Sequence, residues 1–294
     1  MRIRATAAAV TVSGALALTA FAVPAAQADD SASAAKRAQA LVSDAAAAQQ
    51  HNGARALTRS AADDGEGDTA ISNVVVNGGK DLVAGTSATL KFAVTFTVKD
   101  NSGVLSAQAF LWKGSALDEN ALGWFPLEDE ASCKVVNATT STCTQHFQAS
   151  PKTELYNGLE GGNWHVWALA QGNDYDYATK DNYKTVGLKR YSKLTTNAAP
   201  EPVKKGKTIT VSGLLSRANW DTGKYAGYTK QKVTLQYRKK TSSTYSNVKT
   251  VTSSSTGALK TTVTASADGY FRYKFAGTST TPAVTSVSDF VDVR

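Results

Sequence analysis

Cysteine and histidine are scarce in this sequence, which has 2 cysteines and 3 histidines among 294 residues. None of the histidines lies in an H-E-x-x-H, G-x-S-x-G or metal-ligand spacing. The carboxylate triplet Glu128-Asp129-Glu130 could in principle serve acid–base chemistry, but such a run in a loop is typical of a solvated surface. The sequence therefore predicts a protein that is not an enzyme.

Long hydrophobic runs are also lacking beyond the first segment, and none approaches the roughly 18 apolar residues that a membrane span requires. Residues 1–28 have Arg2 and Arg4 before a small, apolar stretch and end on Ala26-Gln27-Ala28, the A-x-A pattern of a signal-peptide cleavage site. No cysteine follows to carry a lipid, and no hydrophobic tail with basic residues ends the sequence. We expect removal of residues 1–28 and export of a freely secreted protein.

The two cysteines, Cys133 and Cys143, form a disulfide by default in an exported protein. The ten-residue spacing indicates two short strands around a turn near Ala138, which places the two sulfur atoms opposite each other. In the chain-entropy model such a bridge contributes about 2–3 kcal/mol to stability. A redox or metal role is the alternative, but no histidine or cysteine cluster accompanies the pair.

Acidic residues are scarce in one part of the chain only. Residues 189–294 contain 18 basic and 5 acidic residues, whereas residues 69–188 contain 8 and 12, so the net charge of +8 arises in the last third. Residues 29–68 are rich in alanine and polar residues with few large apolar side chains. This composition predicts a flexible arm and linker without a packed core.

Short runs of apolar residues separated by Gly, Asn, Asp and Ser predict an all-β chain with two domains, 69–188 and 189–294. In the first we expect strands at 71–76, 88–98, 107–112, 163–170 and 185–189, besides the cysteine hairpin. In the second we expect strands at 191–196, 207–215, 232–238, 245–252, 258–265, 269–276 and 287–293. Trp164 and Trp167 differ by three positions on one strand, so we expect one in the core and one outside.

The second domain resembles the bacterial immunoglobulin-like domains of secreted actinobacterial proteins. The resemblance lies in P-E-P at 200–202, K-G-K-T-I-T-V-S-G at 205–213, V-T-L-Q-Y-R at 233–238, T-V-T-A at 262–265, D-G-Y-F-R-Y at 268–273 and S-D-F-V-D-V at 288–293. It covers 191–294 well and 69–190 loosely. It implies two tandem immunoglobulin-like β-sandwiches that act as spacers, adhesion units or accessory binding units. Some proteins of this kind carry calcium-binding labels.

A basic outer face is predicted on the second domain, provided that the strands at 232–238 and 269–276 are neighbours as in the resembling fold. Its members are cations and aromatic rings: Lys232, Arg238, Arg272, Lys274 and Tyr270, with Trp220 nearby on the loop 217–230. Clustered cations attract polyanions, and aromatic rings stack on sugars. In the extracellular space this favours an anionic cell-wall polymer or polysaccharide over nucleic acid. The alternative is that these cations only keep an exposed sheet soluble.

Acidic loops of the first domain suggest calcium as a cofactor, since calcium takes roughly six to eight oxygen ligands from carboxylates and carbonyls. The candidate residues are Asp118 and Glu119 in the predicted loop 113–130, and Asp174, Asp176 and Asp181 in the predicted loop 171–183. They could meet if both loops lie at the same end of the sandwich, although the spacing is not that of an EF-hand. The acidic run at 63–68 could also be loosely suited to calcium, and the alternative is a solvated connector.

The sequence thus predicts a secreted, non-catalytic binding or structural module whose partner is an anionic polymer. A calcium-binding accessory protein is the second hypothesis. The third is a protease inhibitor or substrate, because Lys36-Arg37, Arg55 and Arg59 in the arm suit trypsin-like cleavage. The sequence does not indicate an oligomeric state.

Overall fold

The computed structural model describes residues 63–117 and 121–294, so the predicted signal peptide and nearly all of the arm lie outside the described residues. Apart from one short 3-10 turn, Asn77–Gly79, the regular elements there are β-strands. No helix of the described part has the length and apolarity needed to cross a membrane. The prediction of an all-β chain is confirmed.

The chain forms two compact units, and each is described by itself. The first contains the described residues up to Asp81 together with Lys91–Ala149 and Asn163–Val186. The second contains Gly187–Arg294 and two earlier segments, Leu82–Leu90 and Ser150–Gly162.

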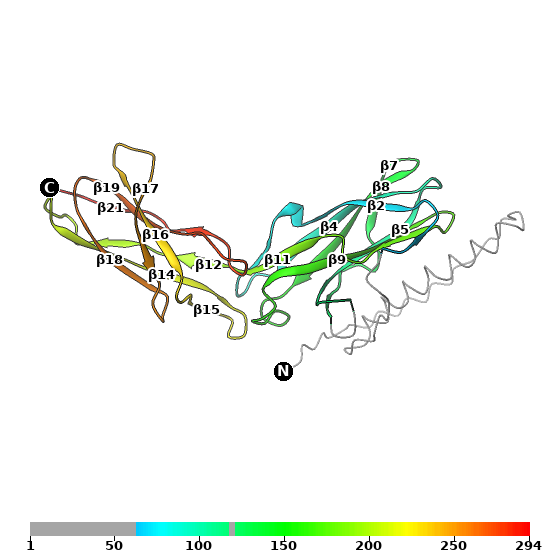
Figure 1. Cartoon of the computed structure of the whole chain (residues 1–294), viewed down its shortest axis with the longest axis horizontal. Helices are drawn as coiled ribbons and strands as arrows, with labels where there is room; N and C mark the ends of the chain where they lie inside the picture. Colours follow the sequence, from blue (N-terminus) through cyan, green and yellow to red (C-terminus); the bar gives the residue numbers. More distant parts are fainter. Residues whose placement is uncertain (1–62, 118–120) are drawn as a thin grey trace, which may run out of the picture. The chain divides into compact units, whose positions relative to one another are not determined.

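The first unit is a β-sandwich (Figure 1). One sheet has the order β2-β4-β8-β7, with β2 at Ala70–Val76, β4 at Leu90–Lys99, β8 at Thr140–Ala149 and β7 at Ser132–Asn137. In the other sheet β9 (Gly161–Gly172) pairs with β5 (Val104–Lys113) and β10 (Tyr177–Lys180), while β6 (Leu122–Trp124) extends β5 and β1 (Gly65–Glu66) extends β10. The two sheets follow the A-B-E-D and C-F-G order of an immunoglobulin-like fold.

The core of the first unit follows the predicted alternation in β4. Phe92, Val94, Phe96 and Val98 are buried, while the residues between them are more exposed. The Phe92 ring stacks on Phe147 with centroids 5.0 Å apart. Period-two burial on one face is what a strand of a two-layer sandwich requires.

Trp164 and Trp167 do point to opposite faces of β9, but both are buried, with 3% and 6% of their surface exposed. The prediction of an exposed tryptophan is wrong because the chain covers both faces of this sheet. Trp167 stacks on Phe110 at 4.8 Å, and Phe125, which follows β6, packs against the same cluster. Residues 113–130 were predicted as one loop. They instead include strand β6, and Phe125 covers the side of the sheet that carries Trp167.

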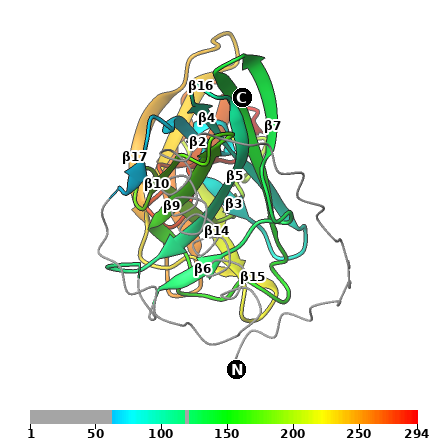
Figure 2. The ribbon, with the colours of Figure 1, turned by 90° about the vertical axis from the view of Figure 1, so that its right-hand side faces the viewer.

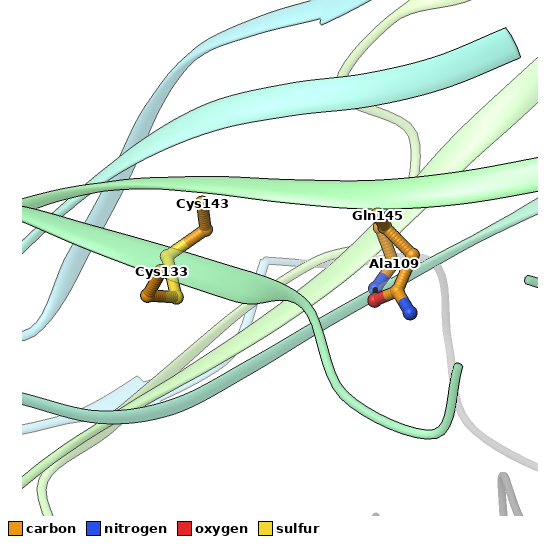
Figure 3. The surroundings of a disulfide bond; sticks show 4 residues. All are labelled: Ala109, Cys133, Cys143 and Gln145. Carbon is orange, nitrogen blue, oxygen red and sulfur yellow. Dashed lines mark hydrogen bonds between the residues drawn. A yellow bond between two sulfur atoms is a disulfide. The ribbon is translucent and has the colours of Figure 1, made fainter.

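The predicted disulfide is confirmed. Cys133 on β7 lies directly opposite Cys143 on β8, and the turn between the strands falls at residues 138–139. Further along β8, the fully buried Gln145 points toward β5 (Figure 3). Its Oε1 accepts the Ala109 N–H at 3.2 Å, and its Nε2 donates to Glu128 O at 2.7 Å. Gln145 therefore satisfies a backbone N–H of β5 and a backbone carbonyl of the segment that follows β6.

The second unit is also an immunoglobulin-like sandwich. One sheet centres on β14 (Thr208–Asn219), which pairs with β12 (Ser192–Leu194), β13 (Asn197–Ala199), β15 (Lys224–Gly227) and β18 (Ala258–Thr264). The other has the order β17-β16-β19, with β17 at Ser246–Thr252, β16 at Lys232–Lys239 and β19 at Gly269–Phe275, and both β20 (Val284–Thr285) and β21 (Asp289–Val291) pair with β19. The strands β16 and β17 lie side by side in both views (Figures 1 and 2).

Tyr273 joins the two sheets of the second unit. It is fully buried on β19, and its hydroxyl donates to Val211 O on β14 at 2.9 Å. Burial raises the pKa of this hydroxyl to about 12, so it stays a neutral donor. The strand at 269–275, with Phe271, Tyr273 and Phe275 inward, is as predicted.

The earlier segments of the second unit are held by polar contacts. β3 (Leu82–Ala84) pairs in parallel with β11 (Thr185–Arg190), at Leu188, Lys189 and Arg190. The Arg190 guanidinium is buried and contacts Glu160 Oε1 at 3.1 Å and Asn157 Oδ1 at 2.6 Å. Short-range sequence patterns do not predict these pairings, because they join residues more than 25 positions apart.

Replacing Gln145 by Ala should destabilise the first unit by about 1–3 kcal/mol, because it leaves buried backbone groups of Ala109 and Glu128 without partners. Denaturant unfolding followed by tryptophan fluorescence measures this, since four of the five tryptophans lie in the first unit. Gln148→Ala, on the exposed side of the same strand, is the matched control and should change stability by less than about 0.5 kcal/mol. Equal effects of the two substitutions would contradict this role of Gln145.

Candidate functional site

A basic face covers the outer side of β16 and β19 in the second unit. The two strands are antiparallel, with Val233 opposite Phe275 and Leu235 opposite Tyr273 on the core side. The alternate residues therefore share the outer side. We call these Lys232, Arg238, Tyr270, Arg272 and Lys274 the basic face. The predicted strand pairing is present, and it places these five residues together.

Two arginines of the basic face are stacked on aromatic rings. The Arg238 guanidinium carbon lies 3.9 Å from the centre of the Tyr270 ring. The Arg272 guanidinium carbon lies 3.6 Å from the centre of the Tyr245 ring, which Arg238 also approaches at 5.4 Å. Such contacts stabilise a cation by about 0.5–1 kcal/mol at exposed sites. They also hold each guanidinium in one orientation.

Hydrogen bonds fix the same arginines further. Arg272 Nε donates to Gln236 Oε1 at 2.9 Å, and Gln236 Nε2 donates to Asn247 Oδ1 at 2.9 Å. Arg238 Nη1 donates to Ser242 O at 2.8 Å. All of these partners are neutral, and within residues 121–294 neither guanidinium forms an ion pair with a carboxylate. The face thus carries two oriented cations without a neutralising charge.

Trp220 does not belong to the basic face. It is 3% exposed, and its indole Nε1 donates to Gly85 O at 2.9 Å. The predicted loop 217–230 is instead a hairpin of β14 with β15, which belongs to the other sheet. Tyr245 and Phe290 take the place that sequence reasoning gave to Trp220, because the Tyr270 ring also contacts Phe290, at 5.1 Å. Phe290 lies on β21, and Tyr245 directly precedes β17. Both fall within predicted strands, at 287–293 and 245–252, but the sequence did not indicate that their rings contact the basic face.

A cluster of three carboxylates lies at one end of the first unit. Oxygen atoms of Asp68, Asp100 and Asp176 all lie within 4.8 Å of one another. Asp100 follows β4 and is 2% exposed, and its carboxylate accepts the Ser102 N–H at 2.8 Å and the Thr69 hydroxyl. Asp176 Oδ2 accepts the Asp68 N–H at 3.0 Å.

Like charges crowd this acidic cluster. Burial raises the pKa of Asp176, and the charges of Asp174, Asp100 and Asp68 raise it further, against the lowering effect of the hydrogen bond from the Asp68 N–H. Asp174 lies next to the cluster, where its Oδ1 accepts the Asp176 N–H at 3.3 Å. The arrangement offers oxygen ligands of the kind that a divalent cation takes.

The acidic cluster includes only part of the predicted calcium set. Asp176 belongs to it and Asp174 adjoins it, whereas Asp118 and Glu119 lie outside the described residues. Asp181 is not a member, and its backbone carbonyl accepts the Trp112 indole N–H at 2.8 Å. The loop predicted at 171–183 contains strand β10, which separates Asp181 from Asp176. The sequence did not indicate Asp100, although this residue directly follows the regular strand β4.

Comparisons with known proteins do not identify a function for the basic face or the acidic cluster. The sequence model of a family of unknown function (DUF5707) matches residues 80–170, less than half of the chain. No curated protein matches. Similar solved structures include the D00-D0 domain of intimin, at 15% identity and a TM-score of 0.23 over 76% of this chain and 99% of that one.

Two further structures are comparably distant. A putative membrane anchored protein from Corynebacterium diphtheriae has 12% identity and a TM-score of 0.27 over 77% of this chain and 59% of that one. Salmonella alpha-2-macroglobulin has 13% identity and a TM-score of 0.29 over 80% of this chain and 16% of that one. The description of the fold therefore rests on the strand order within each unit.

Asp176→Asn should stabilise the first unit at neutral pH in the presence of a chelator. The pKa of Asp176 in the folded state is raised above the ordinary value of about 3.8. The free energy of unfolding of the wild type therefore falls as pH rises from about 3.8 through the raised pKa. Above that pH the contribution of this group stays constant. The stability difference between variant and wild type should grow over this acidic range and level off. Denaturant unfolding at several pH values measures it. A difference that does not vary with pH would contradict the repulsion.

Proposed function

We propose that this protein is a secreted, non-catalytic module that binds an anionic polymer of the cell surface through the basic face. The observation that carries the proposal is the pair Arg238 and Arg272, which are oriented by aromatic rings and hydrogen bonds but not neutralised by a carboxylate. Anion binding stabilises a cation most when that cation is partly withdrawn from water and has no other counter-charge. The solubility role alone would not need fixed guanidinium groups.

The charge of the second domain supports the same proposal. Residues 189–294 carry 13 more basic than acidic residues, and such an excess raises the local concentration of polyanions. Export, proposed from residues 1–28, favours a wall polymer or acidic polysaccharide over nucleic acid. The protease hypothesis depends on residues 36–59, which lie outside the described residues.

The combined variant Lys232→Ala, Arg238→Ala, Arg272→Ala and Lys274→Ala should lose binding to purified cell wall and to dextran sulfate. The loss should be about 30-fold at low salt, taking about 0.5 kcal/mol for each exposed ion pair, and should shrink as salt screens the charges. Retention on immobilised wall and titration with dextran sulfate measure it.

The matched control removes four cations outside the basic face, Lys204, Lys205, Lys207 and Lys260, all of which are exposed. Both variants have the same net charge, so only the position of the lost charges differs. Equal binding by the two variants would show that the effect is one of overall charge. Unchanged binding by the first variant would overturn the proposed face.

We infer calcium binding at the acidic cluster as a second function, independent of the first. The observation that favours it is the approach of three carboxylates within 4.8 Å, which a calcium ion would neutralise. Asp68, Asp100 and Asp176 would supply ligands, and Asp174 lies close enough to assist by charge. The ion would join residues that are separate in sequence and so stabilise the fold.

Calcium should raise the melting temperature of the first unit and release or absorb heat in a calorimetric titration. Asp100→Asn together with Asp176→Asn should abolish both effects, whereas Asp181→Asn, whose side chain lies outside the cluster, should preserve them. Wild-type protein that shows neither heat nor a shift in melting temperature would refute the site. A response that survives in the double variant would locate calcium elsewhere.

A further inference from the structure

We propose that the basic face is a linear track for an extended polyanion, anchored at one end by two arginines that bind oxyanions edge-on. This inference rests on the proposed polyanion function and adds the direction of the bound chain and the chemistry of its recognition. It follows from the register of two strands and from the contacts of the two guanidinium groups.

The four cations follow one another at regular steps along the strand direction. Register pairing places Lys274 opposite Thr234 and Arg272 opposite Gln236. On the outer side of β16, Thr234 and Gln236 lie between Lys232 and Arg238. Lys274 and Arg272 are therefore level with these two intermediate positions. Each step spans two residues, or about 6.8 Å, and the whole row spans about 20 Å. One cation at each step forms a line of positive charge.

No described carboxylate interrupts this line. Asp268 contacts Lys240 Nζ at 3.7 Å and accepts the Val293 N–H at 2.9 Å. Asp289 accepts the Ala198 N–H at 2.7 Å, away from the outer side of the sheet. The carboxylates nearest in the strand pairing are thus engaged with other groups.

The arginine end of the track is preorganised for oxyanions. A ring covers one face of each guanidinium, at 3.9 Å for Arg238 and 3.6 Å for Arg272, so the hydrogen-bond donors lie at the edges. One donor of each arginine is committed, to Ser242 O and to Gln236 Oε1. The other donors of each planar fork suit two parallel hydrogen bonds to a carboxylate, phosphate or sulfate.

The lysine end differs. Lys232 and Lys274 are exposed, and within the described second unit neither forms an ion pair with a carboxylate. An ammonium on a flexible stem supplies charge without a fixed geometry. The ligand class is therefore a linear polymer with repeated oxyanions, whose anionic groups lie along β16 and β19. Polyuronates and polyol phosphodiesters share this chemistry.

The first test compares wild type with Arg238→Lys plus Arg272→Lys, using oligogalacturonates and glycerol-phosphate oligomers as probes. The variant keeps every charge, so the dependence of affinity on salt should stay the same. Affinity should fall about tenfold because the paired hydrogen bonds and ring stacking are lost. Arg294→Lys, an exposed arginine that pairs only with Asp292 Oδ2 at 3.0 Å, is the matched control and should bind as wild type. Titration calorimetry measures all three.

The second test varies the length of both probes. Affinity per molecule should rise until the oligomer spans the row of about 20 Å and then level off apart from statistical factors. The two probe series separate the sources, because the one with the higher plateau identifies carboxylate or phosphodiester as the preferred group.

Each outcome decides the inference separately from the proposed function. Wild type that binds neither probe nor cell wall would refute both. Wild type that binds while the lysine variant binds equally well would overturn edge-on recognition and leave the polyanion function standing. Affinity that keeps rising with oligomer length would overturn the linear track. Melting temperatures of all variants show that a lost affinity does not reflect unfolding.

Discussion

The antiparallel register between β16 and β19 decides both the stability and the surface of the second unit. With Leu235 opposite Tyr273, the apolar residues of both strands enter the core and Tyr273 reaches across to β14. The same register brings the cations of the two strands into one row on the outer side. A slip by one residue would turn the cations inward and the aromatic rings outward. The packing of the core therefore fixes the spacing of the outer charges.

The aromatic contacts of the basic face have two consequences. They offset part of the repulsion between nearby cations, because each arginine lies against the negative face of a ring. They also restrict the rotamers of long side chains, which lowers the entropy lost when a ligand binds. The contacts that reduce the repulsion between the cations therefore also orient the arginines for binding an anion. In the acidic cluster of the first unit, by contrast, like charges lie close together, and a bound cation would reduce the repulsion between them.

Much of the fold could be predicted from the sequence because the strongest strands have regular alternation. β4 and β19 show period-two patterns of large apolar residues, and the ten-residue spacing of Cys133 and Cys143 predicted their hairpin. The short strands β6, β10 and β15 were missed because three or four residues cannot establish a period. The expectation that one of Trp164 and Trp167 is exposed was wrong because the residues that cover Trp167 come from distant parts of the sequence.

The same distinction between regular strands and irregular segments applies to the candidate sites. The five residues of the basic face were predictable because they lie on two long strands whose pairing the fold class implies. Trp220, Tyr245 and Asp100 were not, because their positions depend on turns and on contacts between distant segments. Regular strands let a sequence predict which residues share a face, whereas residues at strand ends need the structure.

The most direct test of the central claim is a nuclear magnetic resonance titration of the isotopically labelled protein with dextran sulfate. If the polyanion binds along the basic face, the Arg238 and Arg272 Nε resonances and the amides of β16 and β19 should shift first, while those of β14 and β18 stay in place. Shifts that are spread evenly over the second unit, or that concentrate on β14 and β18, would contradict it.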